Sequence, residues 1–148
     1  MNKEKHIKKL QSILVSKDYS RLEAVCLEMA PKYEESFLYY FLGVAQFKMN
    51  MLYAAEYNLK KSIFLDKDIV APYVILSKVF IELNDFTLAE EVLLKAMDID
   101  QENIEIHFNY ISILKVQNKK KESLLAMSEA IKIFPKSKEL IKLKNEIK

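Results

Sequence analysis

Histidine and cysteine, the side chains that most often act as catalytic bases, nucleophiles and metal ligands, are rare in this sequence of 148 residues. The two histidines, His6 and His107, lie far apart in the chain. We expect His107 to pack between helices rather than to act as a base or ligand. Cys26 is the only cysteine, which excludes an intrachain disulfide and a CxxC metal or redox site. We expect its side chain to be buried as a small hydrophobe.

Two pairs of carboxylates, Asp66 with Asp68 and Asp98 with Asp100, have a spacing that could suit cation binding or acid–base chemistry. No calcium-loop spacing D-x-D-x-D-G follows either pair. Both pairs precede a predicted helix, where acidic side chains cap the first turn. Gly43 is the only glycine, so glycine-rich phosphate loops and a GxSxG elbow are absent from the sequence. We expect no enzymatic activity, no cofactor and no metal site.

The net charge of +2 is unevenly distributed, because residues 1–17 and 115–148 are rich in lysine and residues 18–114 are acidic. Such runs are usually solvated helix faces, although basic ends could contact a polyanion. Arg21 is the only arginine, so bidentate contacts with phosphate or guanine are scarce and we expect no nucleic-acid partner. The longest uncharged run, 36–47, is too short to span a membrane. No signal peptide is evident, and we expect a cytoplasmic protein.

The sequence repeats itself with a period of 34 residues, which is the spacing between Asn50, Asn84 and Asn118. The other residues that match across the three units are Tyr39, Tyr73 and His107; Leu42, Leu76 and Tyr110; Ala55, Ala89 and Ser123; Leu59, Leu93 and Met127; Ser62, Ala96 and Ala130; and Leu65, Ile99 and Ile133.

Each unit predicts two amphipathic helices joined by a tight turn, because apolar residues recur at i, i+3, i+4 and i+7. Asparagine tolerates a positive φ, so we expect Asn50, Asn84 and Asn118 to reverse the chain between the helices. Small side chains such as Ala55 and Ala89 predict close approach of the two helix axes. The predicted helices cover residues 37–49 and 52–65, 70–83 and 86–99, and 104–116 and 124–133.

These features resemble the tetratricopeptide repeat (TPR) family, whose motif is W-x₂-L-G-x₂-Y…A-x₃-F…P. The sequence departs from the motif because it has no tryptophan, Ser77 and Ile111 replace the glycine, and Lys67 and Gln101 replace the proline. The resemblance implies an all-α, right-handed superhelical solenoid of about nine helices in antiparallel pairs. Residues 1–148 then form one domain with a degenerate leading pair at 3–33, units at 36–69, 70–103 and 104–137, and a capping helix at 137–147.

The first helix of each pair carries a second apolar stripe, which Tyr40, Val44 and Phe47 form in the first unit. In TPR proteins these positions line the concave surface on which peptides and partner helices dock. Alternatively, the leading pair folds over the stripe and buries it. The resemblance implies a peptide-binding groove made of Phe37, Tyr40, Val44, Phe47, Lys48, Val74, Lys78, Ile81, Phe108, Ser112 and Lys115.

The sequence therefore predicts a non-catalytic module that binds a peptide or helix of another protein in an apolar concave groove. Two alternatives stay open: a secretion-type chaperone for an exported subunit, and a structural subunit that docks or self-associates through its apolar stripe. Some TPR cochaperones hold acidic C-terminal peptides with a clamp of lysine, asparagine and arginine side chains. The absence of that clamp disfavours such a ligand here, because the clamp positions hold Tyr40, Val44, Ile75, Glu105 and Asn109.

Overall fold

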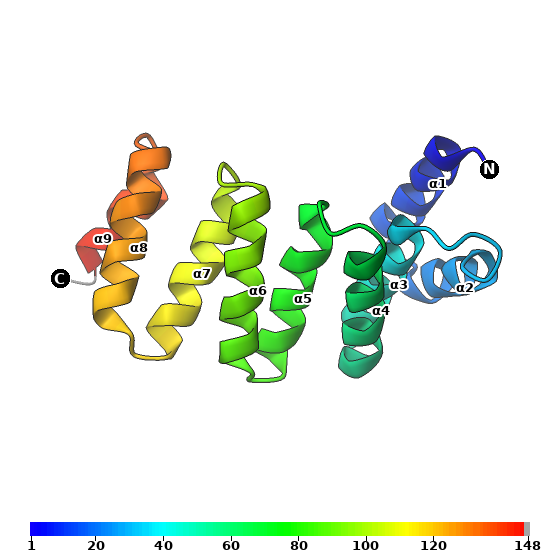
Figure 1. The fold of residues 1–148 in the computed structure, drawn as a ribbon, viewed down its shortest axis with the longest axis horizontal. Helices are drawn as coiled ribbons and strands as arrows, with labels where there is room; N and C mark the ends of the chain where they lie inside the picture. The colour runs from blue at the N-terminus through cyan, green and yellow to red at the C-terminus, as the bar shows by residue number, and fades with distance from the viewer. Residues whose placement is uncertain (147–148) are drawn as a thin grey trace.

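The computed structural model describes residues 1–146, which form nine α-helices and no strand. The helices stand side by side in a row, and each packs mainly on the helices before and after it in the chain (Figure 1). The all-α fold predicted from the repeat is confirmed. The helices are α1 (Lys3–Val15), α2 (Tyr19–Met29), α3 (Ser36–Lys48), α4 (Leu52–Leu65), α5 (Val70–Glu82), α6 (Phe86–Ile99), α7 (Ile104–Val116), α8 (Lys120–Ile133) and α9 (Lys138–Glu146).

Among the described residues, the predicted helix boundaries agree with the structure to within one residue, except at the start of α8. The helix predicted to begin at Leu124 begins at Lys120, because its first turn is polar and carries none of the apolar periodicity that marks the rest. The predicted capping helix at 137–147 corresponds to α9, and Ile147 lies outside the described residues.

The turns within the three helix pairs have the backbone conformation that their asparagines predict. Asn50, Asn84 and Asn118 have φ values of 60°, 58° and 57°. In each turn the residue after the asparagine donates its N–H to a carbonyl five residues back, at 2.8–2.9 Å, as in a Schellman motif. The turn between α1 and α2 uses Lys17 at the equivalent place, with φ 59°, although lysine does not favour this conformation.

The single glycine allows α3 and α4 to approach closely. A Cβ atom on Gly43 would lie 2.6 Å from Cγ of Leu59 and 3.4 Å from the carbonyl oxygen of Ala55. The equivalent residues in the next two units are Ser77 and Ile111. The pairs α3–α4, α5–α6 and α7–α8 pack progressively less closely in that order, as this side chain grows.

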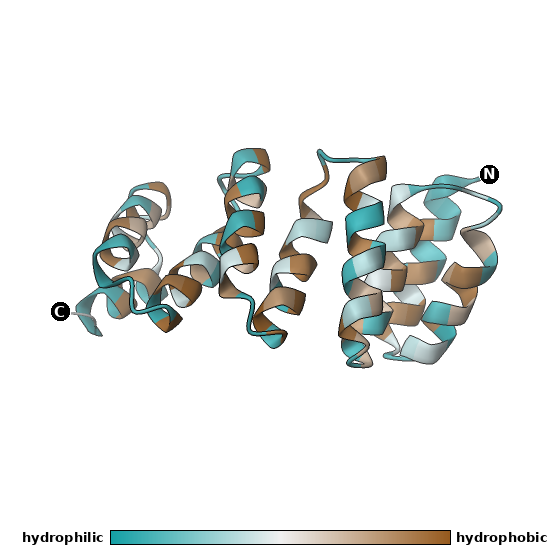
Figure 2. Cartoon of the chain, turned by 60° about the horizontal axis from the view of Figure 1, so that its bottom comes forward, coloured by the Kyte–Doolittle hydropathy of each residue, from teal (hydrophilic) through white to brown (hydrophobic). Residues whose placement is uncertain are grey.

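The core runs through the row of helices as three clusters of buried apolar side chains. Leu10 and Leu22 of the leading pair pack on α3, and Leu140 of α9 packs on α7 and α8. The terminal helices therefore cover the apolar faces that an end unit would otherwise expose. Figure 2 shows that most helices carry both hydrophobic and hydrophilic residues, as an amphipathic repeat requires.

Candidate functional site

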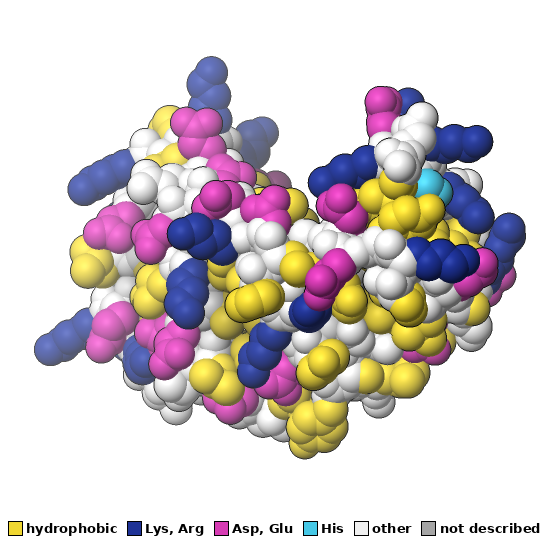
Figure 3. Space-filling model, turned by 45° about the vertical axis from the view of Figure 1, so that its right-hand side comes forward, with side chains coloured by type: hydrophobic (Ala, Val, Ile, Leu, Met, Phe, Trp, Pro, Cys, Tyr) yellow, Lys and Arg dark blue, Asp and Glu magenta, His cyan; other side chains and the backbone are white. Residues whose placement is uncertain are grey.

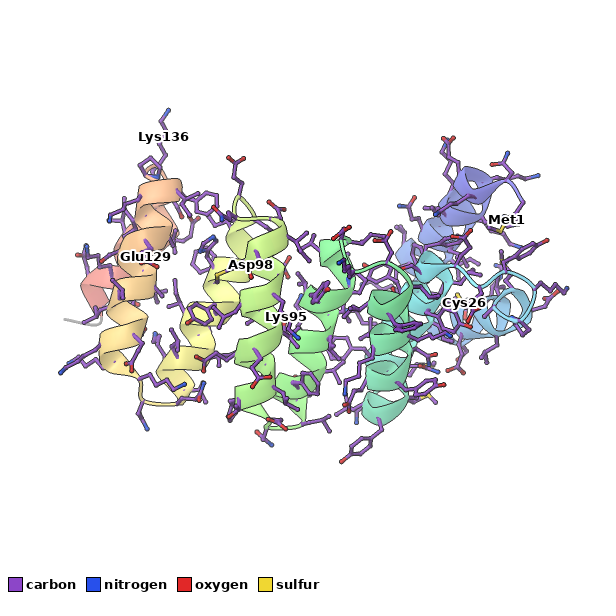
Figure 4. The ribbon with its side chains drawn as sticks, in the orientation of Figure 1. Met1, Cys26, Lys95, Asp98, Glu129 and Lys136 are labelled. Carbon is purple, nitrogen blue, oxygen red and sulfur yellow. The ribbon has the colours of Figure 1, made fainter. Side chains whose placement is uncertain are left out.

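Of the histidine and cysteine side chains, His107 and Cys26 are buried in the core, and His6 on α1 is half-buried. Nε2 of His107 lies 2.8 Å from the carbonyl oxygen of Gln101, and the ring packs edge-on against Phe134, which confirms the predicted packing role. Cys26 is fully buried among the N-terminal helices, and burial raises the pKa of its thiol to about 12 (Figure 4). Both residues are consequently shielded from substrates, and the thiolate that a nucleophile requires is strongly disfavoured.

The paired aspartates stabilise turns rather than helix starts. One carboxylate oxygen of Asp66 accepts the backbone N–H of Asp68 at 3.1 Å, and Asp100 accepts that of Glu102 at the same distance. The predicted capping role is wrong in this respect, because both aspartates fold the loop that precedes the next helix. Within residues 1–146, no group of three or more His, Cys, Asp or Glu side chains is arranged to hold a metal ion, and no helix is long and apolar enough to cross a membrane.

The first helices of the three pairs, α3, α5 and α7, enclose a hollow of about 200 Å³. Three residues of the predicted groove, Tyr40, Val74 and Lys78, line it. The other lining residues are Val70, Ala71, Ile75, Asn103 and Glu105. The sequence analysis named Ile75 and Glu105 as clamp positions and missed the rest, because the small side chain of Ala71 gave no apolar signal.

An ion pair crosses the hollow between α5 and α7. Nζ of Lys78 donates to a carboxylate oxygen of Glu105 at 2.7 Å, and both side chains are partly exposed. Burial raises the pKa of the Tyr40 hydroxyl, and the negative charge of Glu105 raises it further. The hollow therefore presents a protonated phenol, a cation and an anion together with the apolar side chains of α5.

Three residues of the predicted groove, Phe37, Val44 and Val74, are buried within the chain. Phe37 packs into the cluster formed with α1 and α2, and Nζ of Lys3 lies 5.7 Å from the centre of its ring. Val44 is also buried. The leading pair thus covers one end of the apolar stripe, as the alternative reading of the sequence describes, but the hollow lined by Tyr40 and Val74 stays open.

The other predicted groove residues are spread along the three helices. Phe47 and Ile81 are half-buried against the central core cluster, and Phe108 packs against the C-terminal cluster. The exposed predicted residues are Lys48, Ser112 and Lys115. Lys115 borders a separate hollow of about 320 Å³ near the α7–α8 turn, with Asn118, Lys120 and Ser123.

One buried donor on α7 has no hydrogen-bond partner within residues 1–146. The Nδ2 atom of Asn109 is inaccessible to solvent, although the residue as a whole is only half-buried. Asn109 lies one helical turn after Glu105, on the helix that borders the hollow. Buried polar groups are normally paired, but a donor without solvent access cannot reach a bound chain, so Asn109 contributes no contact to the hollow.

No protein-family model matches the sequence, and no curated protein sequence matches it. Solved structures match its fold. The structure of MamA has a TM-score of 0.84 at 18% identity, covering 91% of this chain and 80% of that chain. YrrB, a TPR protein with an unusual peptide-binding site, has a TM-score of 0.78 at 16% identity, covering 92% and 71%.

A third match is the first TPR domain of Spaghetti (RPAP3), solved with the HSP90 peptide SRMEEVD. Its TM-score is 0.66 at 14% identity, and the match covers 77% of this chain and 93% of that chain. The similarity to these structures confirms that the chain has the TPR fold predicted from its 34-residue period.

Proposed function

We propose that this chain, which has the TPR fold, is a non-catalytic protein–protein interaction module that binds a segment of another protein across α3, α5 and α7. The observation that carries the proposal is the open hollow lined by both apolar and polar side chains, among them Tyr40, Ala71, Ile75, Lys78 and Glu105. A concave site with few polar groups above apolar side chains is typical of ligand recognition.

The two kinds of lining residue would serve different purposes in binding. Apolar anchors of the partner would bury surface on Ala71 and Ile75, at about 25 cal/mol per Å² before the entropy of association is subtracted. The Lys78–Glu105 pair and the Tyr40 hydroxyl would orient the bound backbone through hydrogen bonds.

The solved structures support this class of function without identifying the partner. Spaghetti binds an HSP90 peptide, and YrrB has a peptide-binding site, so the fold accommodates peptide ligands. The clamp positions in the present chain hold Tyr40, Val44, Ile75, Glu105 and Asn109 rather than a set of cations. We therefore propose an internal or uncharged segment, not an acidic C-terminus, as the ligand.

The test is a selection of peptides from a random library on the immobilised chain, followed by affinity measurements with fluorescence anisotropy. The variant Ala71→Arg places a long side chain in the hollow, and the fold accepts larger residues there because the equivalent positions hold Phe37 and Glu105. Thr87→Arg is the matched control, because Thr87 is exposed on α6 and does not border the hollow.

We expect the selected peptides to bind Ala71→Arg at least tenfold more weakly than the wild type, and Thr87→Arg with unchanged affinity. Peptides that bind both variants equally would place the site elsewhere. Failure to select any peptide would count against a peptide-binding function.

A further inference from the structure

Helix α4 exposes three large aromatic side chains on the face that points away from the core. Tyr53, Tyr57 and Phe64 are 78%, 71% and 81% exposed. Together with Lys60 they follow the spacing i, i+4, i+7 and i+11, which aligns all four side chains along one side of a helix. We call this set the α4 stripe. Figure 3, turned toward the N-terminal half, shows hydrophobic side chains that protrude from the molecular surface.

The repeat itself shows that the fold does not require aromatic residues here. The residues of α6 equivalent to Tyr53, Tyr57 and Phe64 are Thr87, Glu91 and Asp98, of which Asp98 is labelled in Figure 4. The equivalents on α8 are Lys121, Leu125 and Lys132. The second helices of the other two units thus carry mainly polar or charged residues at these positions. The aromatic residues of α4 therefore call for an explanation other than packing within the chain.

We propose that the α4 stripe is a homodimer interface, in which α4 packs antiparallel on α4 of a second copy around a two-fold axis. The spacing of the stripe is symmetric about its centre. An antiparallel partner therefore sets Tyr53 opposite Phe64 of the other copy, and Tyr57 opposite Lys60. Each two-fold interface then contains two aromatic pairs and two cation–π contacts, and such contacts strengthen when they are removed from water.

The charges on α4 favour a second copy as the occupant. The acidic residue Glu56 lies in the N-terminal half of the helix, and Lys60 and Lys61 lie in the C-terminal half. Antiparallel pairing brings Glu56 of each copy toward the lysines of the other, whereas a parallel pair would align like charges. Within one chain Glu56 and Lys60 already pair at 2.6 Å, so the two pairs can exchange partners across the axis.

The exposed area suits the centre of a dimer interface. Aromatic side chains bury about 150–250 Å² each, so three that are about three-quarters exposed present roughly 400–500 Å² per copy. A standard interface buries about 800 Å² per partner, so the α4 stripe would supply its apolar core. Met51, which is also exposed, directly precedes the helix and extends the apolar surface.

The primary test is sedimentation equilibrium of the full chain over a concentration series from about 1 to 500 μM, a range that brackets weak association. We expect the wild type to shift from the 17.4 kDa monomer toward twice that mass. The variant Tyr53→Thr/Tyr57→Glu/Phe64→Asp takes the residues that α6 carries at the equivalent positions, and we expect it to stay monomeric. Tyr57→Glu alone is the milder second variant, to be used if the triple variant unfolds.

The matched control is Leu94→Glu/Leu125→Glu, which removes exposed hydrophobic side chains from α6 and α8 and should dimerise like the wild type. A wild type that stays monomeric throughout the series overturns the proposal. The proposal is also overturned if the triple variant is folded and dimerises with unchanged affinity. If the triple variant unfolds, the same result for folded Tyr57→Glu overturns the proposal.

The register is tested by disulfide cross-linking under mild oxidation. A mixture of Tyr53→Cys and Phe64→Cys chains should form mixed dimers faster than either variant forms dimers with itself. The native Cys26 is fully buried and should not contribute. Faster cross-linking of Tyr53→Cys with itself than with Phe64→Cys would exclude the antiparallel arrangement.

Discussion

Tyr73 and His107 occupy equivalent positions in successive repeats, and each contacts the backbone carbonyl that lies six residues before it. The hydroxyl of Tyr73 donates to the carbonyl oxygen of Lys67 at 2.9 Å, and Nε2 of His107 lies 2.8 Å from the carbonyl oxygen of Gln101. In both repeats the hydrogen bond ties the first helix of the pair to the loop that leads into it. A histidine can therefore replace the tyrosine without loss of the contact.

The shared hydrogen bond predicts different outcomes for two substitutions of His107. His107→Phe keeps an aromatic ring but removes the nitrogen that contacts the carbonyl oxygen of Gln101. We therefore expect a loss of about 1 kcal/mol in the free energy of unfolding. His107→Tyr restores the group found in the preceding repeat and should change stability by less than about 0.5 kcal/mol. Urea denaturation of both variants measures the difference. Equal losses would show that ring packing against Phe134, not the hydrogen bond, stabilises this position.

The fold could be predicted because its signals are local and repeated. Each of the three units specifies a helix hairpin through a turn asparagine and small residues at fixed offsets within the 34-residue period. The asparagines Asn50, Asn84 and Asn118 adopt the expected backbone conformation. The leading pair has a weaker signal, since Lys17 stands where the others have asparagine. A backward step of 33 residues from Asn50 reaches Lys17, so the repeat phase contained the missing information.

The lining of the hollow was only partly predictable. Periodicity identifies which face of a helix is apolar, but it does not distinguish a covered face from an open one. Phe37 is buried by the leading pair, and the hollow opens beside Ala71, whose small side chain gave no signal. The same limitation applies to α4, where Tyr53 and Phe64 count toward an apolar pattern but are exposed.

Gly43 offers a direct test of close helix packing. We expect Gly43→Ala to destabilise the fold by about 1–2 kcal/mol, even though alanine favours a helix by about 1 kcal/mol, because the new methyl group would overlap the buried Leu59 side chain. Ser77→Ala is the control, since a β-carbon is already accommodated there. It loses the hydrogen bond from Oγ to the carbonyl oxygen of Val74 but gains helix propensity, so the net change should be small. Urea titrations of the wild type and both variants measure the changes in the free energy of unfolding. A stabilising effect of Gly43→Ala would contradict the packing explanation.

Lys17 is a site at which the protein can be stabilised. Its φ of 59° is unfavourable for a lysine, and a left-handed conformation costs roughly 1–2 kcal/mol for a residue with a β-carbon. Lys17→Gly should therefore raise the free energy of unfolding by about 1 kcal/mol. Asn50→Gly serves as the comparison and should gain less, because asparagine already tolerates this conformation. A lower melting temperature for Lys17→Gly would contradict the prediction.

Glu90 should make the stability of the fold depend on pH in the acidic range. It joins α6 to the α7–α8 turn by accepting hydrogen bonds from Lys119 at 2.7 Å and Gln117 at 2.9 Å. Burial alone would raise the pKa of this carboxyl, but the hydrogen bonds from Lys119 and Gln117 outweigh it and lower the pKa below the ordinary value of 4.5.

Because the folded-state pKa of Glu90 is depressed, its stabilising effect is complete above about pH 4.5 and is lost as the pH falls through the folded value. We expect Glu90→Gln to be less stable than the wild type at pH 7 and equally stable once the pH is below the folded-state pKa. Glu91→Gln is the control for the loss of one carboxylate from the same helix. Thermal melts of the three proteins between pH 2 and pH 7 measure the effect, and a difference independent of pH would show that the Glu90 charge is not its source.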